Sequence, residues 1–161
     1  MSKLKIIISW LLVIIWMIVI FAFSNMDADN SNKQSMGLID KTVETTTNIT
    51  NNVGITDIKD KEIEKITEDL NFPVRKLAHM FCYFVLATLV INALKSSGIN
   101  NRIMIITIVI CFIYSCLDEY HQTFINDRSG KFTDCLIDMI GSIFAVIIYK
   151  IIGKFGKKCK I

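Results

Sequence analysis

Four hydrophobic segments, each long enough to cross a lipid bilayer, limit what this chain can fold into. They cover residues 4–23, 77–94, 103–124 and 132–152. A helix needs about 20 residues to cross the hydrocarbon core of a membrane, with a range of roughly 17–25. Inside lipid only a helix or a closed barrel satisfies all of its backbone hydrogen bonds. The sequence therefore predicts an all-α bundle of four transmembrane helices, built as a single domain over residues 1–161.

The first hydrophobic segment follows two lysines, so a cleavable signal peptide is the alternative to a membrane anchor. Ala22, Phe23 and Ser24 offer small residues at the spacing of a cleavage site. The apolar run, however, is longer than the roughly 7–15 residues of a signal-peptide core. We therefore expect residues 4–23 to remain as the first transmembrane helix.

Residues 24–74 separate the first two hydrophobic segments and are polar and acidic. Their second half carries apolar residues at near-helical spacing, namely Ile55, Ile58, Ile63, Ile66 and Leu70. Asn71 and Pro73 favour a helix end there. We expect a partly helical extracytoplasmic segment whose short amphipathic helix stops before the second span. Such a helix either rests on the membrane surface or binds a partner.

The basic residues predict the orientation of the chain. Lysine and arginine in short flanks favour the cytoplasmic side. They occur before the first span, in the short connection between spans two and three, and in the C-terminal tail. All three positions place both termini in the cytoplasm of a multi-pass cell-membrane protein. The same rule and attraction to anionic lipids explain the lysine-rich tail, so we expect membrane lipids as partners and no nucleic acid.

Polar and ionisable side chains collect at one end of the last three spans. In chain order they are Arg75, Lys76, His79, Asp118, Glu119, Gln122, Arg128, Asp134 and Asp138. Four-residue steps place some of them on one helix face, and the predicted topology brings all of them to the outer side. Ionisable side chains at membrane depth are costly and usually functional. The sequence therefore predicts an outward-facing ligand-binding site.

The chemistry of this predicted site stays open at this point. His79, Glu119 and Asp118 are the candidates for general acid–base catalysis. The spacing of the histidines and carboxylates matches no standard metal motif, so we expect neither a metal nor another cofactor. The alternative is an ion-pair network that only holds the helices together. We favour a ligand site because polar bonds between membrane helices average only about 0.6 kcal/mol, which makes so many charges an inefficient way to stabilise packing.

Small residues on the last span predict a close helix contact. Gly141 and Ala145 are four residues apart and continue the face of Asp134 and Asp138. This spacing lets another helix approach closely. We therefore expect the two aspartates to face the inside of the bundle.

These residues resemble the signatures of the VanZ-like family of bacterial membrane proteins. Arg75-Lys76-x-x-His79, with Tyr83, is similar to the first signature. The second signature is similar to Asp118-Glu119-x-x-Gln122 followed by Arg128, Asp134, Asp138 and Gly141. Ser24, Ser31 and Ser35 are similar to the serine-bearing stretch that follows the first span in members from Gram-positive bacteria. Where a Pro-Gly turn is common in the family, this chain has Ile125-Asn126-Asp127.

The resemblance implies a cell-envelope protein that binds or acts on a cell-surface amphiphile. A cell-wall precursor, a lipid-linked substrate or a lipoglycopeptide would be such a partner. The family takes its name from a protein associated with resistance to the glycopeptide teicoplanin, so the resemblance also links the chain to glycopeptide resistance. An enzyme acting on a lipid-linked envelope substrate and a membrane scaffold without a catalytic site are the alternatives.

Overall fold

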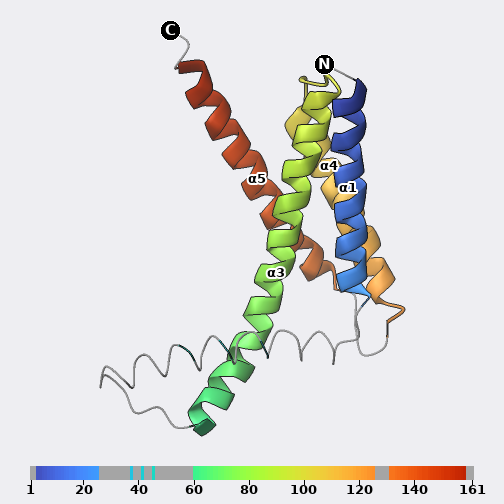
Figure 1. The fold of residues 1–161 in the computed structure, drawn as a ribbon. Helices are drawn as coiled ribbons and strands as arrows, with labels where there is room; N and C mark the ends of the chain where they lie inside the picture. The colour runs from blue at the N-terminus through green and yellow to red at the C-terminus, as the bar shows by residue number, and fades with distance from the viewer. Residues whose placement is uncertain are drawn as a thin grey trace.

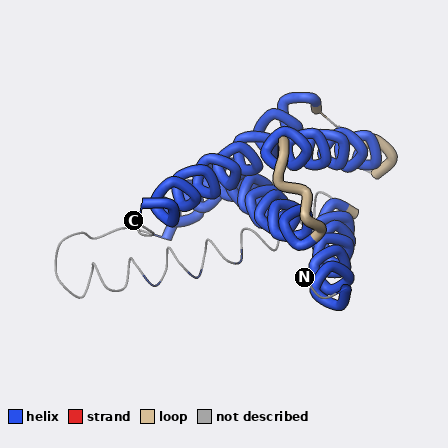
Figure 2. Tube along the Cα trace, turned by 90° about the horizontal axis from the view of Figure 1, so that it is seen from above, coloured by secondary structure: helices blue, strands red, loops and turns tan. Residues whose placement is uncertain are grey.

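The computed structural model describes residues 3–25, 60–125 and 131–158, together with Gly37, Lys41 and Thr45. Within it, only the backbone is described for residues 60–69, 71–72 and 154–158. Four helices make up this part of the chain: α1 (Lys3–Ser24), α3 (Asp60–Ser96), α4 (Ile103–Gln122) and α5 (Phe132–Lys158). Figure 2 shows that the described residues outside the short connections are helical.

Each of the four helices contains a segment that is long and apolar enough to cross a membrane. These segments are Lys3–Ser24, Pro73–Ser96, Ile103–Gln122 and Phe132–Gly153. The predicted all-α architecture with four helices long and apolar enough to span a membrane is thereby confirmed, with limits within a few residues of those expected. The beginning of α1 and the end of α5 lie at the same end of the bundle (Figure 1), as an even number of crossings requires.

Helix α3 is the centre of the bundle and packs against α1, α4 and α5. Its buried residues include Tyr83, Leu86, Ala87 and Val90, all of which are fully inaccessible. Helix α5 also packs against α4, then leans away from the other helices toward its C-terminal end (Figure 1). The end of the bundle where α5 begins is thus the one at which α3, α4 and α5 are held together.

Helix α1 touches the bundle along a narrow stripe and otherwise exposes large apolar side chains. The buried residues are Ser9, Val13, Ile20 and Ser24, which recur on one helix face. The indole N–H of Trp16 donates to the carbonyl oxygen of Cys82 on α3 at 2.9 Å. Since the exposed faces would meet lipid rather than water, this narrow contact suits a transmembrane helix.

Helix α3 differs from the sequence-based expectation because it runs without interruption through Pro73. The prediction that a separate amphipathic helix stops near Asn71 was wrong. A proline removes one backbone hydrogen bond from a helix interior, but the chain on both sides keeps a helical pattern, so the helix continues. Within the predicted 24–74 segment, residues 26–59 apart from Gly37, Lys41 and Thr45 lie outside the described residues.

The turn after α3 is fixed by a glycine with left-handed backbone geometry. Gly98 has a φ of 80°, and the N–H of Ile99 donates to the carbonyl oxygen of Leu94 at 3.0 Å. This pattern is the Schellman motif, which satisfies the free carbonyl groups at a helix C-terminus. The motif returns the chain directly into α4, which lies beside α3.

Helices α3 and α5 come into close backbone contact at Gly141. A Cβ atom built on Gly141 would lie 2.0 Å from the backbone oxygen of Met80. Only a residue without a side chain fits there, as the spacing of Gly141 and Ala145 predicted. This crossing sets the relative position of the polar residues that precede it on both helices.

Candidate functional site

Two acid–base pairs connect α3 with α5 just before the Gly141 crossing. The ammonium group of Lys76 forms an ion pair with the carboxylate of Asp134. One turn further along both helices, Nδ1 of His79 lies 3.8 Å from Oδ1 of Asp138. Because both helices advance about one turn between the pairs, the pairs are stacked along the α3–α5 contact.

Asp138 is the residue at which three helices meet. Its side chain is 1% exposed, and its second carboxylate oxygen accepts a hydrogen bond from the hydroxyl of Ser115 on α4 at 2.8 Å. A buried carboxylate requires such donors or cations, because its removal from water is otherwise very costly. Asp138 therefore fixes α4 against the pair formed by α3 and α5. We call Lys76, His79, Ser115, Asp134 and Asp138 the polar site.

A second set of polar contacts joins α4 to the end of α1. The amide nitrogen of Gln122 lies 2.9 Å from the hydroxyl of Ser24 and 3.4 Å from a carboxylate oxygen of Asp118. These three side chains are all buried. The contact between Gln122 and Asp118 is the one that their four-residue spacing predicted. The contact between Gln122 and Ser24 anchors the end of α1 to α4.

Glu119 is buried with 6% of its surface exposed. Its carboxylate accepts a hydrogen bond from the backbone N–H of Lys131 at 3.0 Å, the residue just before α5. A carboxylate at a helix N-terminus is favoured by the free N–H groups and the helix dipole. The geometry therefore gives Glu119 a part in positioning the start of α5, in addition to the catalytic or ligand-binding role for which the sequence makes it a candidate.

Comparison with known protein families gives one match. A family model described as VanZ/LLP1 matches residues 9–153, which includes nearly all of the four candidate spans. The chain belongs to the VanZ/LLP1 family. No curated protein and no solved structure matches it.

In this VanZ/LLP1 protein, most of the residues expected at the site lie at one end of the bundle. Lys76, His79, Asp134 and Asp138 are in contact as described, and Asp118, Glu119 and Gln122 occupy the last turns of α4. Arg75 is half-buried on α3 next to Lys76. Arg128, together with Ser31 and Ser35, lies outside the described residues.

Sequence reasoning had given two serines of this VanZ/LLP1 site no role as hydrogen-bond partners. Ser115 donates to Asp138, and Ser24 lies within hydrogen-bond distance of Gln122. The available signal was position: Ser115 precedes Asp118 by three residues and Glu119 by four, which places it near their helix face. Which carboxylate it would bind depended on the packing of α4 against α5, and the sequence does not show that packing.

The arrangement restricts the chemistry that the VanZ/LLP1 site could perform. The hydroxyl of Ser115 donates to the buried carboxylate of Asp138, whereas an activated serine nucleophile donates to a general base such as an imidazole. The side chain of His79 is 26% exposed while its partner Asp138 is buried. His79 is therefore the group of this pair that can reach a ligand, either as a hydrogen-bond partner or to transfer a proton. Among the described residues, no three histidine, cysteine, aspartate or glutamate side chains cluster closely enough to hold a metal ion.

Proposed function

We propose that this VanZ/LLP1 protein binds the polar headgroup of a cell-envelope amphiphile at the polar site, on the outer side of the membrane. The observation that carries the proposal is the stack of two acid–base pairs at the ends of the spans, with His79 partly exposed beside buried Asp138. A headgroup with donors and acceptors can exchange hydrogen bonds with such pairs, whereas an acyl chain cannot.

The family resemblance supports the choice of ligand class. Cell-wall precursors, lipid-linked substrates and lipoglycopeptides all combine a polar group with a long apolar chain. A protein that sequesters or modifies one of them would lower susceptibility to teicoplanin-type glycopeptides. The resistance effect is a consequence of the proposed binding and not a requirement for it.

The proposed binding is tested by measuring which amphiphiles stay bound to the protein. The full-length chain is purified from bacterial membranes in mild detergent, and retained lipids are identified by native mass spectrometry. We expect a defined amphiphile on the natural protein and its loss from His79→Ala and Lys76→Gln. Thr88→Ala is the matched control, because Thr88 lies exposed on the same helix and its hydroxyl bonds within its own helix. Retention that is equal in all four proteins would contradict the proposal.

A purely structural network is the alternative that this design must separate. If His79 and Glu119 serve the ligand, His79→Ala and Glu119→Gln should accumulate in the membrane at the natural level while ligand retention or glycopeptide tolerance falls. If both variants fail to accumulate, the charges hold the bundle together and the ligand proposal is wrong. Quantitative immunoblotting of membrane fractions, with Thr88→Ala alongside, measures this directly.

The outward orientation is a separate part of the proposal and rests on the lysine and arginine flanks. In a chain with its cysteines replaced by serine, single cysteines at Lys131 and at Asn101 report the two ends of the bundle. We expect a membrane-impermeant maleimide to label the Lys131→Cys variant in intact cells and the Asn101→Cys variant only after cell lysis. The opposite pattern would place the polar site on the cytoplasmic side.

Catalysis is the second candidate function and is favoured by the contact between His79 and Asp138. A carboxylate beside one imidazole nitrogen orients the ring and leaves the other nitrogen available for proton transfer. The bound amphiphile would then leave the protein chemically changed. Mass spectrometry of total envelope lipids from cells with and without His79 would reveal that change as a mass shift, whereas a binder alone would produce none.

A further inference from the structure

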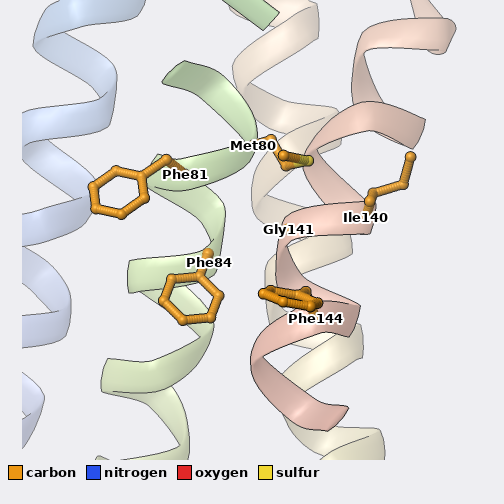
Figure 3. Close-up of a pocket in the computed structure, with 6 residues that line it drawn as sticks. All are labelled: Met80, Phe81, Phe84, Ile140, Gly141 and Phe144. Carbon is orange, nitrogen blue, oxygen red and sulfur yellow. The ribbon is translucent and has the colours of Figure 1, made fainter. Parts of the chain in front are cut away.

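An apolar groove runs along the contact between α3 and α5, directly beyond the polar site. It has a volume of about 410 Å³, which lies within the roughly 300–1,000 Å³ of small-molecule pockets. Its lining consists of Met80, Phe81, Phe84, Ile140, Gly141 and Phe144 (Figure 3). All six residues lie within the candidate spans. We call this pocket the α3–α5 groove.

The close helix crossing accounts for the shape of the groove. Gly141 has no side chain, and the backbone of α5 therefore comes against the backbone oxygen of Met80 and forms the floor. On either side of this floor, larger side chains from both helices form the walls. The rings of Phe84 and Phe144 lie 5.9 Å apart between centroids, tilted by 45°, and narrow the groove at one end (Figure 3).

The α3–α5 groove and the polar site follow one another along the same pair of helices. Lys76 precedes Met80 by four residues, and Asp134 precedes Gly141 by seven, so helical periodicity places each pair on a shared face. The Lys76–Asp134 ion pair therefore lies at the membrane-edge end of the groove. A ligand aligned with the helices would meet charged groups first and apolar walls one to two turns deeper.

We propose that the α3–α5 groove holds the acyl chain of the amphiphile whose headgroup binds the polar site. The inference rests on the proposed function and adds the part of the ligand that enters the membrane. Residues 80 to 84 of α3 rise by only about 6 Å, so the groove accepts a slender chain segment and is too short for the side-chain stripe of another helix. The adjoining acid–base pairs match the polar end that every membrane amphiphile carries next to its chain.

Shape is what distinguishes the groove from ordinary lipid contact. Lipid tails are as apolar as leucine, so burial of a chain against the protein gains no hydrophobic free energy inside a membrane. A groove instead contributes van der Waals contacts on several sides of the chain at once. The expected preference is therefore modest and must be measured against other lipid-facing surfaces of the same protein.

The experiment uses the full-length chain in nanodiscs of phosphatidylglycerol that include a trace of phosphatidylglycerol with a diazirine in its acyl chain. After illumination, mass spectrometry of peptides measures labelling on the groove walls and on Ile15 and Ile18, which are comparably exposed on α1. We expect severalfold more label per exposed side chain in the groove than on α1, because the groove contacts the chain on several sides at once. Equal labelling of both surfaces would overturn the inference.

A pair of substitutions on α5 tests whether the label reports the groove itself. Ile140→Trp replaces an aliphatic side chain of the groove by a bulky indole ring, and Ile143→Trp is the control because Ile143 is also exposed on α5 but does not line the groove. We expect the first variant to lower labelling of Phe84 and Phe144 to the level of α1, and the second to leave it unchanged. If Ile140→Trp leaves the labelling of Phe84 and Phe144 unchanged, the inference is contradicted. Failure of the headgroup proposal would appear separately, as amphiphile retention that His79→Ala does not alter.

Discussion

Replacing Gly141 by alanine should destabilise the bundle, because the new methyl group has no space. The added Cβ would lie 2.0 Å from the backbone oxygen of Met80, whereas ordinary contacts begin at 3.4 Å. The two helices must therefore separate by about 1.4 Å, the difference between these two distances. The obstacle is backbone, so no side-chain rotation relieves it. Overpacking of this kind typically costs about 1–3 kcal/mol.

Gly141→Ala also has a stabilising effect, the higher helix propensity of alanine, and a control variant is needed to separate it from the overpacking. Alanine favours a helix over glycine by about 0.8–1.0 kcal/mol, so the helix propensity offsets part of the cost. Gly153 lies further along α5, and a Cβ atom added to it would meet no other atom within 4 Å, so Gly153→Ala shows the propensity gain alone. Both variants gain the same helix propensity. We therefore expect the free energy of unfolding of Gly141→Ala to be about 1–3 kcal/mol lower than that of Gly153→Ala, which is the cost of overpacking alone.

Thermal unfolding in detergent micelles, followed by circular dichroism, measures this difference. A loss of 1 kcal/mol lowers the midpoint by about 2–4 °C for a chain of this size, so Gly141→Ala should melt roughly 2–12 °C below Gly153→Ala. Asp138 lies one turn before Gly141, so the separation of α3 from α5 should also disturb the His79–Asp138 contact. Amphiphile retention should therefore be weaker in Gly141→Ala. If Gly141→Ala melts at or above the midpoint of the control, the close crossing does not exist as described.

Three further contacts, two in the polar site and one between α1 and α3, can each be tested by substitution. Ser115→Ala removes the 2.8 Å hydrogen bond to a buried carboxylate and should cost about 0.6–1.7 kcal/mol in thermal unfolding, whereas exposed Thr88→Ala should change little. Lys76→Asp and Asp134→Lys should each destabilise the protein, and their combination should restore the midpoint because the ion pair re-forms in reverse; no recovery in the double variant would refute the pairing. Trp16→Phe removes the bond from α1 to α3 and should cost about 0.6 kcal/mol, with Leu11→Phe on the exposed face as control.

The four spans could be read from the sequence because length and hydropathy alone decide whether a segment crosses a membrane. The close approach at Gly141 was predictable for a similar reason, since small residues four apart have one common use in membrane helices. The continuation of α3 through Pro73 was not predictable, because proline favours a helix end while the residues on both sides of it keep a helical pattern. The local sequence does not show whether the helix ends at such a proline or continues through it.

The residues of the candidate site were predictable as a set, but their pairing was not. Helical spacing on α5 shows that Asp134 and Asp138 share a face, yet it does not show that the first meets Lys76 and the second meets His79. That pairing depends on the register of α3 against α5, which the crossing at Gly141 fixes. Ser115 illustrates the same limit, since its partner lies on a different helix from the carboxylates near it in sequence.

The unbroken course of α3 through Pro73 has a mechanical consequence. About a dozen residues of this helix precede the candidate span, and at 1.5 Å per residue they extend the helix by roughly 20 Å beyond it. Because proline leaves one helical hydrogen bond unmade, this is the point at which the rod bends most easily. Bending at Pro73, three residues before Lys76, would move this arm without shifting the register of the residues beyond it.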